Sequence, residues 1–166
     1  MASDRSFSVE RLITIFRKDS LFWIVAIAGL ILDQASKQII VQMFSQPGHS
    51  WPIWPGVFHL TYVLNTGAAF SSFRGGANWL KWLSLGVSVL IMIFVSKSPK
   101  LSRLEQFAYG CILAGALGNG IDRFYLGHVI DFLDFYLIKF PVFNLADTFI
   151  NMGIIGLLIS SFSRSR

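Results

Sequence analysis

Two aspartates in the C-terminal third of the chain, Asp131 and Asp147, have the surroundings that carboxylate catalysis requires. Each is a single acid flanked by apolar residues such as Ile130, Phe132 and Ala146. Apolar surroundings raise the pKa of a carboxylic acid, and two acids that approach each other share one proton. The ionised member can then activate water while the neutral member protonates a carbonyl, which hydrolyses a peptide bond without metal. Acids within membranes also serve transport and ion pairing, so spacing alone leaves these roles open.

Two further charged pairs could take part in such a site. Asp33 and Lys37 are four residues apart, the spacing at which helical side chains form an ion pair. They either neutralise each other near the membrane interface or contact a substrate backbone or headgroup. Asp122 and Arg123 are adjacent, and such a pair can hold a loop through charge-assisted hydrogen bonds. We favour that structural role for Asp122, whereas Arg123 could instead bind a phosphate or a substrate carbonyl.

Other kinds of catalytic chemistry find little support. His49, His59 and His128 show no metal-ligand spacing, and the sequence contains no HExxH motif. The serines lack convincing histidine and acid partners, and there is no phosphate-binding loop. Cys111 is the single cysteine and lies within an apolar stretch, where it is interpreted as a packing residue. The sequence therefore favours carboxylate chemistry with neither metal nor cofactor.

The elements that must position these residues are membrane spans. Only 14% of the 166 residues are charged and 54% are apolar, whereas soluble domains are about 25% charged. Four apolar stretches approach the roughly 20 residues that a spanning helix needs. They are Leu21–Met43, Trp79–Val95, Leu104–Phe124 and Val142–Phe162. The remaining chain is too short for a separate soluble domain, so we expect one membrane domain over residues 21–163.

The net charge of +5 is a signal of topology rather than of nucleic-acid binding. Basic residues collect before the first span, in the Ser96–Arg103 loop and after the fourth span. Because basic loops stay in the cytoplasm, both termini are predicted to be cytoplasmic, with some attraction to anionic lipid. Residues 1–20 are predicted to form a cytoplasmic amphipathic segment. The Ala26–Ala28 stretch resembles a signal-peptide cleavage site, but the apolar run continues beyond it, so we expect no cleavage.

Four crossings bring sequence-distant residues to one outer layer. The first and third spans end at the outer side, and the second and fourth begin there. The polar residues that share this depth are Asp33, Asn65, Asn119, Asp131, Asn144 and Asp147. The Val57–Val63 stretch has β-forming character and follows Trp51 and Trp54, so it predicts a short strand on the membrane surface.

Five sequence blocks occur in an order that resembles one known family. The blocks are Leu32–Lys37, Asn65–Ser71, Gly115–Asn119 with Asp122-Arg123, Val129–Phe132, and Phe143–Asp147. Together they resemble the bacterial lipoprotein signal peptidases, also called signal peptidase II, from about Leu21 to Phe162. One departure is Thr148, where a serine is common in the family. Residues 1–20 match nothing in the pattern.

The resemblance implies an all-α polytopic inner-membrane enzyme, with four transmembrane helices, a small outer-face β-cradle and both termini in the cytoplasm. Such an enzyme cleaves prolipoproteins on the N-terminal side of a diacylglyceryl-modified cysteine and is inhibited by globomycin-type antibiotics. The resemblance makes Asp131 and Asp147 the catalytic pair. The positions that would bind substrate or support the site are Asp33, Lys37, Asn65, Gly67, Asn119, Arg123, Asn144 and Ala146.

Two rival functions make different demands on the sequence. A proton-coupled transporter would need acids or broken helices near the membrane midplane, whereas these acids gather at one edge. A non-enzymatic membrane scaffold would have no reason to keep two apolar-flanked aspartates. Both rivals fit the sequence less well than a peptidase.

Overall fold

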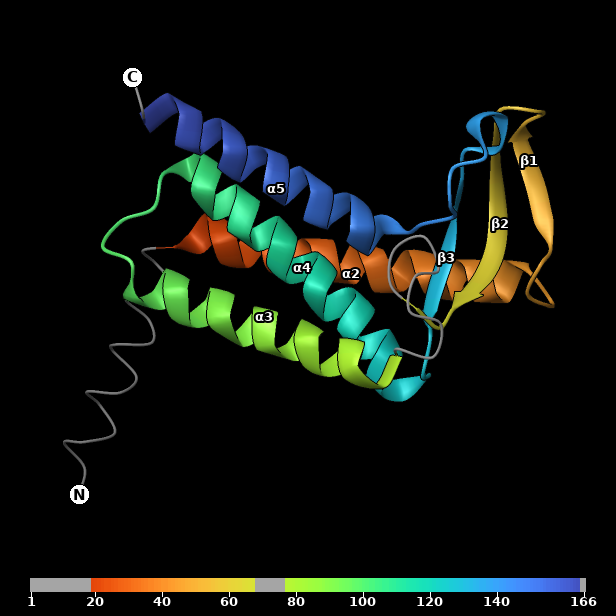
Figure 1. Ribbon diagram of the computed structural model, residues 1–166, viewed down its shortest axis with the longest axis horizontal. Helices are drawn as coiled ribbons and strands as arrows, with labels where there is room; N and C mark the ends of the chain where they lie inside the picture. The colour runs from red at the N-terminus through yellow and green to blue at the C-terminus, as the bar shows by residue number, and fades with distance from the viewer. Residues whose placement is uncertain (1–18, 68–76, 165–166) are drawn as a thin grey trace.

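The chain forms a bundle of four long helices with a small sheet at one end (Figure 1). The structure, a computed structural model, describes residues 19–67 and 77–164. The helices are α2 (Ser20–Met43), α3 (Ala77–Lys97), α4 (Arg103–Tyr125) and α5 (Leu145–Arg164). The predicted amphipathic segment 1–20 lies almost wholly outside the described residues, as does the second half of the Asn65–Ser71 block.

The four helices agree with the four predicted spans, but α4 differs from the others in composition. Helices α2 and α5, and α3 from Trp79 onward, are long and apolar enough to cross a membrane. Helix α4 falls short of that apolarity because it carries Glu105, Asp122 and Arg123. It packs against each of the other three helices, so less of its surface would meet lipid. A central helix can therefore be more polar than its neighbours.

Small residues allow the helices to approach closely. A Cβ atom at Gly153 of α5 would collide with the backbone of Ala108 in α4. Likewise, a Cβ at Gly29 of α2 would press against Ala114 of α4. Lipid tails are as apolar as the helix surfaces, so the hydrophobic effect does not hold membrane helices together. Close van der Waals packing does so instead, and small residues at the crossings allow it. The bundle is thus held tightly around α4.

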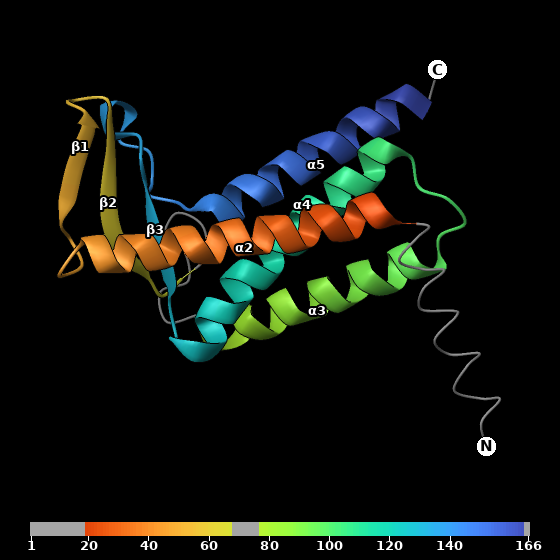
Figure 2. The same ribbon diagram turned by 180° about the vertical axis from the view of Figure 1, so that it is seen from behind.

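The sheet has three antiparallel strands in the order β1 (Ser50–Trp54), β2 (Phe58–Asn65) and β3 (Val129–Asp134). It lies at the end of the bundle where α2 ends and α5 begins (Figures 1 and 2). Strand β2 confirms the strand predicted over Val57–Val63. Strand β3 lies between the third and fourth predicted spans, where the sequence predicted no strand. Its first four residues are buried, because they lie between β2 and the bundle.

A hydrophobic cluster fixes the sheet to the helices. Its buried members are Ile40, Phe44, Tyr62, Ile130 and Phe132, from α2, the residue just beyond α2, β2 and β3. Because the cluster joins β3 to α2, it sets the position of every residue that β3 carries.

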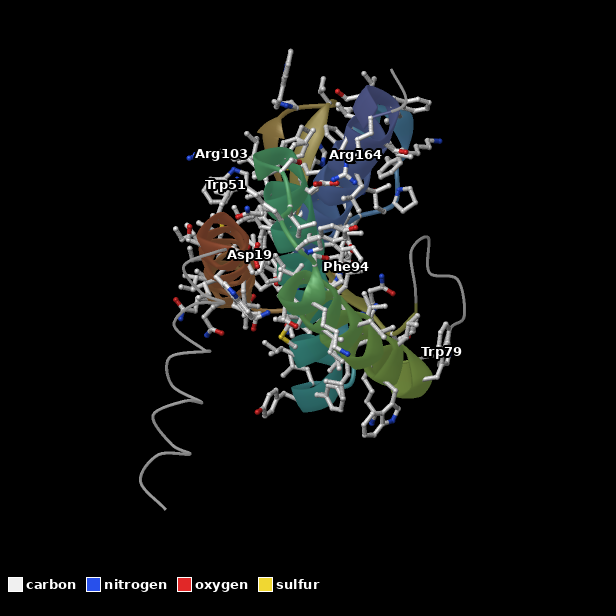
Figure 3. All side chains as sticks on the ribbon, turned by 90° about the vertical axis from the view of Figure 1, so that its left-hand side faces the viewer. Asp19, Trp51, Trp79, Phe94, Arg103 and Arg164 are labelled. Carbon is white, nitrogen blue, oxygen red and sulfur yellow. The ribbon has the colours of Figure 1, made fainter. Side chains whose placement is uncertain are left out.

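The opposite end of the bundle is basic. Figure 3 looks onto this end, with Asp19, Arg103 and Arg164 near the viewer. Arg164 pairs with Glu105 at 3.0 Å, and Ser102 caps α4 in a reciprocal capping box with Glu105. The beginning of α2, the α3–α4 connection and the end of α5 therefore lie together, away from the sheet (Figure 1).

Candidate active site

Asp131 lies in the middle of β3, with its carboxylate held by two amides. Its Oδ2 accepts a hydrogen bond from Asn65 Nδ2 at 2.9 Å, and its Oδ1 accepts one from Asn144 Nδ2 at 2.6 Å. Asn65 ends β2, and its Oδ1 accepts from the backbone N–H of Gly67. Asp131 is only 2% exposed. Strand pairing and the two amides therefore fix this carboxylate in place.

Asp147 is held by the start of its own helix. The backbone N–H of Asp147 donates to Asn144 Oδ1 at 3.0 Å, and the N–H of Asn144 donates back to Asp147 Oδ2 at 3.3 Å. This reciprocal pair has the form of a capping box, which satisfies amides that a helix start leaves unpaired. The other oxygen, Oδ1, accepts from Asn119 Nδ2 at 2.8 Å. The geometry that begins α5 therefore also orients the acid.

Two asparagines connect the acids. Asn144 Nδ2 donates to Asn119 Oδ1 at 3.0 Å as well as to Asp131, while Asn119 contacts Asp147. Asn144 is fully buried and Asn119 nearly so. A continuous chain of amides thus runs from one carboxylate to the other.

Behind the amides lies a buried ion cluster centred on Lys37. Its Nζ is 2.8 Å from Asp33 Oδ2 and 2.9 Å from Asp122 Oδ2, and it donates to Asn119 Oδ1 at 3.1 Å. Asp33 and Lys37 are 0% and 2% exposed. The predicted ion pair is therefore present. Its burial favours mutual neutralisation over a contact with a substrate backbone or headgroup.

The acids of this cluster anchor the two segments that carry the catalytic candidates. Asp33 Oδ1 accepts from the backbone N–H of Ala146 at 2.9 Å, which ties the start of α5 to α2. Asp122 Oδ2 accepts from the N–H of Ile130, which ties β3 to α4. Gln34 also donates to Asp122 at 3.0 Å. Asp122 thus has the loop-holding role that its position beside Arg123 suggested. Gln34 belongs to the same network, although sequence reasoning passed over it as a site residue.

Arg123 spans the gap between α4 and the segment after β2. Its Nη1 donates to the carbonyl of Asn119 at 3.3 Å, and its Nη2 donates to the carbonyl of Gly67 at 3.2 Å. The partners are thus two carbonyls of the protein itself. Within the described part of the chain, its buried Nε has no partner.

A cavity of about 730 Å³ opens at the two acids. Its polar wall is Asn65, Asn119, Arg123, Asp131 and Asp147. The rest of the wall is mainly apolar and comes from the β3–α5 connection and one face of α5, notably Phe140, Phe143, Ile150, Met152 and Ile155. Among the chosen candidates, Asp33, Lys37, Asn144 and Ala146 lie behind this wall and do not line it. The structure therefore separates the residues that face the cavity from those that support them.

The cavity wall includes residues that sequence reasoning missed. Phe140, Phe143 and Ile150 carry no distinguishing signal, because apolar residues occur throughout their segments. Asn151 does carry one: it is a polar residue within an apolar span, one turn beyond Asp147. That signal could have singled it out.

The electrostatics of the cavity favour a shared proton. Burial, the larger effect, and the nearby charge of Asp147 together raise the pKa of Asp131 to about 7, while the amides of Asn65 and Asn144 oppose the shift. A carboxyl with this pKa exchanges its proton near neutral pH, as an acid–base catalyst must. No group of His, Cys, Asp or Glu side chains within the described residues is arranged to hold a metal ion.

Comparison with known proteins identifies the family. Residues 25–163 match the sequence profile described as signal peptidase (SPase) II. The chain belongs to this family. A lipoprotein signal peptidase from Microcystis aeruginosa is 68% identical over 147 residues, which cover 89% of this chain and 95% of the relative. One from Synechocystis is 65% identical over 158 residues, covering 95% and 93%. The resemblance of the five blocks is thereby confirmed, and the enzyme is an aspartic peptidase.

Solved structures support the fold of this signal peptidase II. A bacterial membrane enzyme solved by the in meso method at 2.3 Å resolution superposes with a TM-score of 0.79. It is 30% identical and the match covers 86% of this chain and 87% of that one. A second, at 1.9 Å resolution, gives a TM-score of 0.73 at 31% identity, covering 82% and 89%. The predicted helical membrane fold with a small sheet is confirmed, and the enzyme is a multi-pass membrane protein.

Proposed function

We propose that Asp131 and Asp147 are the catalytic pair of this lipoprotein signal peptidase. One observation carries the proposal: the buried carboxylate of Asp131 on β3 and the partly buried one of Asp147 on α5 line the same cavity and are joined through Asn119 and Asn144. The electrostatic effect of Asp147 on Asp131 is what a pair sharing one proton requires.

The proton shared by the two acids determines the role of each acid in the reaction. Near neutral pH Asp131 holds this proton, and the ionised Asp147 accepts a second proton from a water molecule. The water oxygen bonds to the carbon of the scissile carbonyl, while Asp131 gives its proton to the carbonyl oxygen. When the tetrahedral intermediate collapses, the C–N bond breaks and the amine leaves with a proton from the pair. Two positioned carboxyl groups thus supply both the acid and the base.

The substrate is a prolipoprotein whose signal peptide the enzyme removes. We infer that the cut falls on the N-terminal side of a cysteine that carries a diacylglyceryl group. Each buried methylene of such a lipid contributes about 0.8 kcal/mol of membrane affinity, so the substrate stays in the bilayer. The apolar wall formed by Phe140, Phe143, Met152 and Ile155 would receive its apolar parts beside the acids.

The site is proposed to face the outer side of the bacterial inner membrane. Lys97, Arg103 and Arg164 belong to the helix ends remote from the sheet, and basic ends stay in the cytoplasm. Trp51 and Trp54 of the sheet are 53% and 66% exposed, and tryptophan is enriched at membrane–water interfaces. Both termini would then be cytoplasmic, and the sheet would rest on the outer surface among membrane lipids.

Purified enzyme with a lipidated prolipoprotein provides the test of the catalytic pair. Asp131→Asn and Asp147→Asn should each abolish measurable cleavage while leaving an inserted, folded protein. Asp134→Asn is the matched control, because Asp134 lies on the same strand, accepts from Thr61 at 2.7 Å and does not line the cavity. Substantial activity in either of the first two variants, or an equal loss in the control, would remove the assignment.

Inhibition gives an independent check on the substrate class. Globomycin-type antibiotics should block cleavage by this chain, since the family resemblance extends through the whole site. Cleavage that is insensitive to saturating globomycin would count against the proposed lipid-dependent peptidase.

A further inference from the structure

Asn151 is the one polar cavity-lining side chain, within the described residues, that the protein itself leaves without a hydrogen bond. Even Thr148, one turn earlier, donates to the carbonyl of Asn144 at 3.1 Å. Asn151 is solvent-accessible in the structure and lies on the cavity side of α5. Its amide is therefore open to whatever occupies the cavity.

An unpaired amide at this position on α5 is energetically unfavourable. Helix α5 is apolar enough to span a membrane, and Asn151 is followed by Met152, Ile154 and Ile155, all exposed. A polar group in such surroundings is unfavourable unless it finds a hydrogen-bond partner. Because the protein provides none, the partner is expected to come from the ligand.

We propose that Asn151 is a substrate-positioning residue that donates a hydrogen bond to a carbonyl oxygen of the bound prolipoprotein, an inference that rests on the proposed function. Four residues of α-helix place Asn151 about 6 Å along the helix axis from Asp147. A carbonyl held there would set how deep the substrate lies in the cavity. That depth decides which peptide bond meets the two acids.

Two carbonyl sources fit this depth. The signal peptide must leave its helical conformation near the cut, and the last carbonyls of a helix have no intrahelical partner. The diacylglyceryl group brings ester carbonyls that lie a few bonds from the cysteine. Either oxygen would otherwise be buried against the apolar wall without a partner.

The test compares Asn151→Leu with the wild-type enzyme on a lipidated prolipoprotein. A typical hydrogen bond is worth about 0.5–1.5 kcal/mol, so KM should rise roughly two- to tenfold with kcat little changed. Asn151→Gln keeps the amide and should recover part of the affinity. The matched control is Ser161→Leu, the same kind of polar-to-apolar change on α5 but outside the cavity, and it should leave KM unchanged. The thermal stability of Asn151→Leu should not fall, because leucine suits the membrane better than asparagine.

A second substrate distinguishes the two carbonyl sources. In an ether-linked dialkylglyceryl prolipoprotein the ester carbonyls are absent but the backbone is the same. A KM increase confined to the ester substrate assigns the partner to the lipid, and an equal increase on both assigns it to the peptide backbone. An unchanged KM on both substrates, or a loss of stability with lowered kcat, would overturn the proposal. Failure of the wild-type enzyme to cleave either substrate would instead refute the proposed function.

Discussion

Replacing Lys37 with methionine should destabilise the enzyme more than any exposed charge change. The Lys37 ammonium contacts Asp33 and Asp122 at 2.8 and 2.9 Å, and all three side chains are at most 4% exposed. Methionine fills similar space but leaves two acids in one buried site with no cation between them. Removing one partner from a buried ion pair costs about 3–5 kcal/mol. For a chain of this size each kcal/mol lowers Tm by about 2–4 °C, so the expected fall is roughly 6–20 °C.

Thermal unfolding in detergent, followed by tryptophan fluorescence, measures this effect. Lys97→Met is the matched control, because Lys97 is exposed at the remote end of α3 and its removal should change stability by about 0.5 kcal/mol or less. Adding Asp33→Asn to Lys37→Met should recover part of the loss, since one of the two uncompensated charges disappears. If Lys37→Met unfolded no earlier than Lys97→Met, the buried cluster would not be the support that its geometry suggests.

Five further outcomes are expected. Cleavage should follow a bell-shaped pH profile: it falls above about pH 7, where Asp131 with its raised pKa ionises and both acids are charged, and again in acid, where both become protonated. Asn65→Ala removes a hydrogen bond that lowers the Asp131 pKa, so kcat/KM measured against pH should keep its alkaline limb to higher pH. Gly118→Ala should impair cleavage and lower Tm together, because the added Cβ would collide with the Asp33 carboxylate. Precursor without the lipid should be cut much more slowly than lipidated precursor in a side-by-side assay. EDTA should leave cleavage unchanged. If EDTA abolished cleavage and added metal restored it, the aspartic mechanism would be contradicted.

The layer of polar residues could be predicted from the sequence because successive spans cross the membrane in opposite directions. The end of one span and the start of the next therefore lie at the same depth. Asp33, Asn119 and Asp147 come from three different helices, yet the structure joins them within one hydrogen-bonded network. Depth alone does not give rotation about each helix axis. The sequence therefore did not separate Asp33, which is buried behind the site, from Asp147, which lines the cavity.

Strand β3 and the capping role of Asn144 could not be predicted by the same reasoning. Val129–Asp134 becomes a strand because β2 offers it a paired edge, and such tertiary pairing is absent from local propensity. The cap at Asn144-x-x-Asp147 did leave a local signal, since asparagine is a favoured N-cap residue. Reading it would have placed the start of α5 at Leu145 rather than within an apolar run beginning at Val142.

Because the site depends on Asn144, the order in which the chain is synthesised determines when the site can form. Proteins are synthesised from the N-terminus, so α2, the first two strands, α4 and β3 emerge before the segment that begins α5. Until that segment arrives, Asp131 lacks the Asn144 amide and Asp147 does not yet exist. A nascent chain, or one released early by the ribosome, would therefore carry no peptidase activity into the membrane. Peptidase activity would begin only once the segment that starts α5 has joined the rest of the site.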